Sequence, residues 1–275
     1  MESMLKDRVA IITGSGRGIG QAAAKIFASE GAKVVISDID AAPAEETVAQ
    51  IKDAGGEAIS YVGDATAEGF AEGIVKAAAD AFGGIHILVN NAGFTWDGTV
   101  HKMSDKMWDA MLNLHLKTPF QLIRAAAPYF RDAAKKEMES GVVVPRKIVN
   151  VTSIAGTQGN PGQANYSSAK AGMVGLTKTM AKEWGRFNVQ SNAVAFGWVD
   201  TRLTAAKEEA EEGEIERGGE KVKLGIPETQ RQMMKMIIPL GRAGTVQEAA
   251  NVIFFLASPL SDYVSGQVIE MTGGM

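Results

Sequence analysis

Short apolar runs alternate with longer amphipathic stretches along most of this chain, and this alternation constrains the fold more than any other feature. We expect strands at Val9–Thr13, Lys33–Ser37, Ala58–Val62, His86–Asn90, Lys147–Val151, Val189–Ala193 and Gln267–Met271. Repeated strand–helix–strand units favour a parallel sheet covered by helices on both faces, with a ligand crevice at the carboxyl ends of the strands. The predicted fold is therefore α/β: a doubly wound parallel sheet of about seven strands in a single domain, residues 1–275.

The stretches between the predicted strands have helical apolar spacing. The clearest are Ile19–Ser29, Ala44–Ala54, Gly69–Phe82 and Asp105–Phe130. Pro119 lies inside the last of them, and we expect it to kink or break that helix because proline has no backbone N–H to donate.

Composition excludes several function classes. The chain has no cysteine, which excludes disulfides, iron–sulfur clusters and cysteine nucleophiles. Its three histidines, His86, His101 and His115, form no zinc motif, so we expect no metal site. A net charge of −4 gives no sign of a nucleic-acid surface. With no secretory leader and no apolar run of about 18 residues, we expect a soluble cytoplasmic protein without a membrane partner.

One segment departs from the regular pattern. Lys207–Lys223 contains seven glutamates and three lysines, with three glycines among them. It can be a solvated mobile segment, or part of a substrate lid spanning about residues 202–236, because loops of this kind close over ligands.

A glycine-rich loop follows the first predicted strand and opens a helix. Thr13–Gly20 fits the spacing GxxxGxG with Gly14, Gly18 and Gly20, whereas GxGxxG fails because Ile19 stands at its third glycine. Such a loop lets a pyrophosphate approach the backbone and the helix N-terminus, although it can also be a tight turn without a ligand. The candidate contacts are Gly14, Ser15, Gly16, Arg17, Gly18, Ile19 and Gly20.

Asp38 ends the second predicted strand, where a carboxylate can accept hydrogen bonds from the adenosine ribose. It would repel a 2′-phosphate, whereas Arg17 in the glycine loop could pair with one. We expect NAD to be preferred, with NADP as the alternative. Asp38 can also be an ordinary turn residue.

Three residues carry candidate chemistry. Tyr166 and Lys170 are four residues apart, which places them on one helix face. Ser153 follows a predicted strand and so lies at the crevice. The Tyr–Lys spacing alone occurs often by chance.

Together these motifs carry a resemblance. Thr13–Gly20, Asn90–Gly93, Ser153 and Tyr166–Lys170, in this order, resemble the short-chain dehydrogenase/reductase family. The surroundings Ser153–Gly156, Gly162–Tyr166 and Ile238–Arg242 are most similar to 3-oxoacyl-acyl-carrier-protein reductases. The resemblance implies a Rossmann fold, a nicotinamide cofactor and a homotetramer.

The resemblance also implies residue roles. Tyr166 would be the acid–base group, Lys170 would lower its pKa and hold the nicotinamide ribose, and Ser153 would bind the substrate oxygen. Further cofactor contacts would be Asp64 and Ala65 at the adenine, Asn91, Ala92 and Gly93 at the nicotinamide-side ribose, and Val199 and Thr201 at the carboxamide.

His115 departs from the family pattern, which has an asparagine there. It would anchor a catalytic water relay to Lys170, or it merely packs beneath the sheet.

The predicted function is hydride transfer between a nicotinamide cofactor and a ketone or secondary alcohol. The preferred substrate is a 3-oxoacyl thioester, on acyl carrier protein or coenzyme A, with Phe94, Trp96 and Trp198 suited to an apolar acyl tail. One alternative is dehydrogenation of a free alcohol such as a steroid, polyol or xenobiotic. The other is a non-catalytic dinucleotide-binding sensor or scaffold, which would have no need of Ser153, Tyr166 and Lys170 together.

Overall fold

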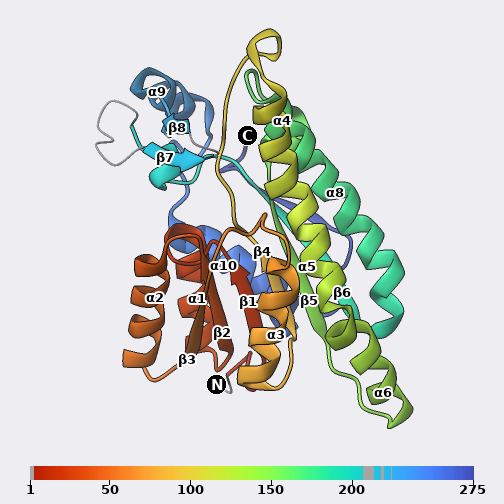
Figure 1. Cartoon of the computed structure of the whole chain (residues 1–275). Helices are drawn as coiled ribbons and strands as arrows, with labels where there is room; N and C mark the ends of the chain where they lie inside the picture. Colours follow the sequence, from red (N-terminus) through yellow and green to blue (C-terminus); the bar gives the residue numbers. More distant parts are fainter. Residues whose placement is uncertain (1–2, 207–213, 218–219, 224) are drawn as a thin grey trace.

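The computed structural model describes residues 3–206, 214–217, 220–223 and 225–275. Within them, seven parallel strands form one sheet in the order β3-β2-β1-β4-β5-β6-β9 (Figure 1). The strands are β1 (Val9–Thr13), β2 (Lys33–Asp38), β3 (Glu57–Val62), β4 (Ile87–Asn90), β5 (Arg146–Ser153), β6 (Val189–Phe196) and β9 (Val268–Met271). The strand order reverses between β1 and β4, which confirms the predicted doubly wound α/β fold.

Helices cover both faces of the sheet. The first face packs against α1 (Gly18–Ser29), α2 (Ala41–Asp53) and α10 (Val246–Ala257), and the second against α3 (Phe70–Phe82), α5 (Thr118–Ala127) and α8 (Ala164–Trp184). Strand β1 is apolar at successive positions because its side chains pack into the cores on both sides of the sheet. Ile12 belongs to the first core cluster and Ile11 to the second. Both faces of the strand are thus buried.

The long helical stretch near Pro119 continues through the proline. Helix α4 (Asp105–Leu112) passes through a π-helical turn, Asn113–Lys117, directly into α5, and the two lie end to end in Figure 1. Proline cannot donate to the carbonyl four residues before it, and the wider turn accommodates this loss. The prediction of a break is therefore wrong, because Pro119 stands in the first turn of α5, where a missing N–H is tolerated.

Shorter elements complete the chain: α6 (Ala133–Glu139), α7 (Ile154–Gln158), an antiparallel hairpin of β7 (Glu214–Arg217) and β8 (Glu220–Lys223), and α9 (Glu228–Ile237). The hairpin and α9 fall in the segment predicted as a lid. Part of that segment, residues 207–213, 218–219 and 224, lies outside the described residues. Within the described part of the chain, every helix is too short or too polar to span a membrane.

His86 closes the amino-terminal edge of the sheet, opposite the crevice. The Val9 N–H donates to His86 Nδ1 at 3.1 Å, so the ring must be unprotonated at that nitrogen. Burial, together with the positive charges of Arg8 and Arg146, lowers the pKa of His86 to about 4. Between this value and the ordinary pKa near 6.5, the unfolded chain binds a proton that the folded chain does not.

We therefore predict that acid destabilises the fold partly through His86. As the pH falls from 6.5 to 4.5, the free energy of unfolding of the wild type should decline more steeply than that of His86→Gln, by up to about 1.4 kcal/mol per pH unit. Urea denaturation followed by circular dichroism measures this difference. The exposed His101→Gln is the matched control and should follow the wild type, whereas parallel curves for wild type and His86→Gln would contradict the prediction.

Candidate active site

The glycine loop is shaped by close backbone approaches. Gly14 has φ +63°, a left-handed conformation, and a Cβ on Gly20 would lie 2.3 Å from the carbonyl oxygen of Gly14. Ser15 is fully buried, and its hydroxyl donates to the Ile12 carbonyl at 2.6 Å and accepts from the Ser37 N–H at 3.0 Å. The loop is thus fastened to β2, and α1 begins close against it.

Thr13 and Asn91 join the carboxyl ends of β1 and β4. The hydroxyl of Thr13 accepts the N–H groups of Asn91 and Ala92, both at 3.0 Å. In return, the Asn91 side-chain amide donates to the carbonyls of Thr13 and Gly14, both at 2.9 Å. The glycine loop and the segment after β4 are therefore held as one unit.

A cleft of about 510 Å³ lies at this edge of the sheet, within the range of small-molecule and cofactor sites. Most of the predicted cofactor residues line it, namely Gly14, Arg17, Gly18, Ile19, Gly20, Asp38, Asp64, Ala65, Asn91, Ala92, Gly93 and Thr201. The cleft lining does not include five others, Ser15, Gly16, Tyr166, Lys170 and Val199. Of these, Ser15, Lys170 and Val199 are buried.

The sequence analysis named Arg202 and Leu203 only as part of the predicted lid. It missed nine other lining residues: Ser37, Ile39, Asp40, Gly63, Thr66, Lys106, Ala110, Asn113 and Leu114. Some had a signal, because Asp40 and Thr66 stand just beyond the ends of predicted strands. The residues of α4 and the π-helical turn had none, since the face that a helix turns to a cleft depends on tertiary packing. Phe94 and Trp96, proposed for an acyl tail, do line the cleft, whereas Trp198 is not in its lining.

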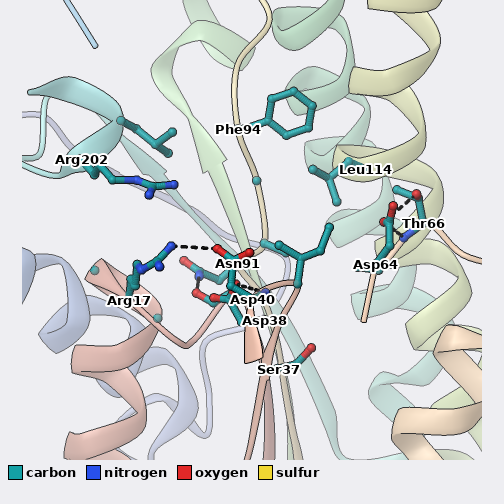
Figure 2. A pocket seen from close by; sticks show the side chains of 18 of the residues that line it. Arg17, Ser37, Asp38, Asp40, Asp64, Thr66, Asn91, Phe94, Leu114 and Arg202 are labelled. Carbon is teal, nitrogen blue, oxygen red and sulfur yellow. Dashed lines mark hydrogen bonds and ion pairs between the residues drawn. The ribbon is translucent and has the colours of Figure 1, made fainter. Parts of the chain in front are cut away.

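Asp38, Asp40 and Arg17 line one side of the cleft, and Arg202 is also among its lining residues (Figure 2). The Asp38 carboxylate accepts the Gly16 N–H at 3.1 Å, and Arg17 forms an ion pair of 2.9 Å with Asp40. Across the cleft, Asp64 accepts both the N–H and the hydroxyl of Thr66 at 2.8 Å. These bonds orient the carboxylates without help from a ligand.

Ser153, Tyr166 and Lys170 come together as predicted. Ser153 ends β5, Tyr166 and Lys170 are one turn apart on α8, and the Ser153 hydroxyl lies near enough to the Tyr166 phenol to lower its pKa. Lys170 is buried, with Nζ donating to the Val151 carbonyl at 2.7 Å and lying 5.5 Å from the centre of the Tyr166 ring. The group adjoins the cleft beyond Gly93 and Phe94.

Burial dominates the titration of this group. It raises the pKa of Tyr166 to about 12, against the lowering effect of the Ser153 hydroxyl, and it lowers the pKa of Lys170 to about 7. Burial of the phenol itself sets the direction of this shift, and the expected lowering of the Tyr166 pKa by Lys170 stays a prediction. The Lys170 amine is itself desolvated and bound to a backbone carbonyl.

His115 lies on the π-helical turn between the cleft wall and Tyr166. Its Nε2–H donates to the Phe94 carbonyl at 2.7 Å, and its ring meets that of Tyr166 edge-on at 5.0 Å. Burial and the nearby Lys170 lower the pKa of His115 well below its usual value, so the ring is neutral. Its Nδ1 is buried without a hydrogen-bond partner among the described residues. His115 is therefore buried against Tyr166 with its Nδ1 available as an acceptor, and both its role as a water anchor and a purely packing role stay predictions.

A doubly wound sheet, a glycine loop and a Ser–Tyr–Lys group beside one cleft define a class of protein, the dinucleotide-binding oxidoreductases. Residues 14–275 match a model of short-chain dehydrogenases described as Enoyl-(Acyl carrier protein) reductase. The chain belongs to the short-chain dehydrogenase/reductase family, as the sequence motifs predicted, and is an NAD(P)-dependent oxidoreductase.

Curated relatives match over nearly the whole chain. The 3-oxoacyl-(acyl-carrier-protein) reductase of Thermotoga maritima is 38% identical, and that of Vibrio cholerae is 36% identical, each over 98% of both chains. The (2S)-((R)-hydroxy(phenyl)methyl)succinyl-CoA dehydrogenase subunit of Thauera aromatica is 36% identical over 98% of this chain and 97% of its own.

Gly93 and His115 fit against each other so closely that we predict their substitutions to be coupled. A Cβ on Gly93 would lie 2.4 Å from His115 Cε1, while the φ of Gly93 is not in the left-handed region. Gly93→Ala should therefore destabilise the wild type by about 1–3 kcal/mol through overpacking, and by at least about 1 kcal/mol less in the His115→Ala background. Chemical denaturation of the four proteins measures this coupling. An equal cost in both backgrounds would contradict it.

Proposed function

We propose that this chain is an NAD(H)-dependent oxidoreductase that interconverts 3-oxoacyl and 3-hydroxyacyl thioesters, as part of fatty acid metabolism. The observation that carries the proposal is the placement of the Ser153 and Tyr166 hydroxyls close to each other and next to the buried Lys170. Two hydroxyls that converge beside a dinucleotide cleft suit a substrate carbonyl, because both can donate to its oxygen. The printed names of the relatives supply the acyl thioester.

The described residues fit a nicotinamide dinucleotide. The backbone approach at Gly14 and Gly20 leaves no room for side chains and brings the first turn of α1, whose N–H groups lack helical partners, to the cleft. These groups would hold the pyrophosphate, Asp38 the adenosine ribose, and Asp64 and Ala65 the adenine. Asn91, Ala92 and Gly93, with Tyr166 and Lys170, would hold the second ribose, and Val199 and Thr201 the carboxamide. When bound, the nicotinamide supplies or accepts the hydride.

Tyr166 is the proton donor in this proposal. Its raised pKa keeps the phenol protonated at neutral pH, so the acid needed for reduction of a ketone is always present. Ser153 donates a second hydrogen bond to the substrate oxygen as negative charge develops there. Lys170, with its pKa near 7, can take up a proton when the phenolate forms and so stabilise it.

We favour NAD over NADP for the electrostatics of the cleft. Asp38 and Asp40 both line the cleft, and Arg17, the basic residue of the glycine loop, is already paired with Asp40 (Figure 2). A 2′-phosphate placed beside Asp38 would meet the negative charge of that carboxylate. The proposed preference for NAD rests on the negative charge that a 2′-phosphate would meet, and not on any one distance.

The acyl group would lie against the apolar end of the cleft. Phe94, Trp96, Leu114 and Leu203 line that end. Relatives are named for an acyl-carrier-protein thioester and for a coenzyme A thioester, so either carrier is compatible with the proposal. A free steroid, polyol or xenobiotic alcohol is the alternative.

Residues 202–236 would form the substrate lid. Arg202 and Leu203 line the cleft, and Arg231 of α9 stacks on Trp198, 5.2 Å from its ring centre, while bonding to the Thr204 carbonyl. Helix α9 is thus tied to the segment that follows β6. The homotetramer that the family resemblance implies stays a prediction. The assignment of residues 1–275 to a single domain also stays a prediction.

The raised pKa of Tyr166 predicts which direction of the reaction responds to pH. Oxidation of the alcohol releases a proton. The ratio of kcat/KM for oxidation to kcat/KM for reduction therefore changes about tenfold per pH unit, whichever group donates the proton. With a phenol of pKa about 12, this dependence should appear in oxidation, whose kcat/KM should rise between pH 7 and 9, while reduction stays nearly flat. Initial rates in both directions test this. A reduction rate that falls about tenfold per unit, with flat oxidation, would contradict it.

Turnover with a panel of ketones tests the function itself. Loss of NADH absorbance should be fastest with 3-oxoacyl thioesters, and Tyr166→Phe should lower kcat by about 10²–10⁴-fold while NADH binding persists. Tyr263→Phe, at a fully exposed tyrosine, is the matched control. Near-normal rates for Tyr166→Phe would rule out its acid–base role, and binding of NADH without turnover of any ketone would favour the sensor interpretation.

A further inference from the structure

Arg17 is the basic residue of the glycine loop, and its side chain is already engaged. Its Nη1 lies 2.9 Å from Asp40 Oδ2, and Figure 2 marks this ion pair with a dashed line. Both side chains are about half exposed, at 48% for Arg17 and 53% for Asp40, and both line the cleft. An arginine bound in this way has one of its donor edges occupied by an acid of its own chain.

Asp40, the partner of Arg17, is itself held in position by Asp38. One oxygen of Asp38 accepts the Gly16 N–H at 3.1 Å, and the other accepts the Asp40 N–H at 3.2 Å. The second bond is a local turn of the kind that aspartate forms with the residue two positions on. A Cβ on Gly16 would lie 2.8 Å from Asp38 Oδ2, so the loop and this carboxylate are in close contact. The Asp38 carboxylate therefore holds the backbone of Asp40, and the Asp40 side chain holds Arg17.

The ion pair contributes little to folding, because half-exposed pairs are typically worth about 0–1 kcal/mol. Its effect on charge is larger. Released from Asp40, the guanidinium could form two parallel hydrogen bonds with a phosphate, which suits its planar shape. Held by Asp40, it presents a neutralised pair beside the negative Asp38. Two other basic residues, Lys106 and Arg202, also line the cleft, so the test must isolate Arg17.

We infer that Asp40 is a positioning residue for cofactor choice, which withholds Arg17 from the 2′-phosphate of NADPH. Discrimination against NADPH then has two sources: repulsion by Asp38 and restraint of Arg17 by Asp40. This inference deepens the proposed function and rests on its cofactor site.

Dissociation constants of NADH and NADPH, measured by the fluorescence of the reduced nicotinamide, test the inference without any substrate. In Asp40→Asn, the ratio of the NADPH constant to the NADH constant should fall about tenfold, which corresponds to about 1.4 kcal/mol. Asp40→Glu keeps a carboxylate that can pair with Arg17, so the ratio of the two dissociation constants should stay at the wild-type value. Glu45→Gln removes an exposed charge from α2, the helix that Asp40 precedes as N-cap, and should leave the ratio unchanged.

The decisive variant removes the arginine as well. Asp40→Asn combined with Arg17→Gln should lose the gain, while Arg17→Gln alone should change the ratio little, because Arg17 is restrained in the wild type. The inference is overturned if Asp40→Asn leaves the ratio unchanged, or if its gain survives without Arg17. The wild-type ratio separately tests the NAD preference, and thioester turnover tests the reaction, so failure of either is distinguishable from failure of the inference.

Discussion

The cleft depends on the hydrogen bonds that join Thr13 to Asn91 at the carboxyl ends of β1 and β4. These four bonds, between 2.9 and 3.0 Å, close the gap at which the strand order reverses. They fix the glycine loop on one side and the Ala92–Phe94 segment on the other. Through the Phe94 carbonyl, the same segment holds His115, whose ring packs on Tyr166. The dinucleotide end and the proton-donating end are thereby joined in one rigid framework.

Desolvation gives the site its protonation states. Tyr166 retains its proton, Lys170 has a pKa near neutrality and His115 is neutral, all because protein rather than water surrounds them. A buried phenol beside an amine that can gain a proton suits a reaction in which a proton leaves the tyrosine for a substrate oxygen. At the exposed adenosine end the control is different, since charge placement on Asp38, Asp40 and Arg17 decides what can approach.

Much of this architecture could be predicted from sequence, because the strands are apolar runs whose carboxyl ends meet at one edge. That rule located Asp38 and Ser153 correctly, and the glycine spacing located the loop. The rule failed for properties that arise from packing. Helix α4 continues into α5 because a π-helical turn precedes Pro119, and the pKa of Tyr166 rises because its surroundings in the folded chain desolvate it. The pairing of Arg17 with Asp40, 23 positions away, had no local signal either.

The titration of Tyr166 tests the central claim most directly. With only four tyrosines in the chain, ¹³Cζ labelling and nuclear magnetic resonance can follow each phenol, and Tyr166→Phe assigns the signal. The account predicts that Tyr166 titrates last, with a pKa of about 12, in the protein without added cofactor. A midpoint at or below the ordinary value near 10 would contradict it.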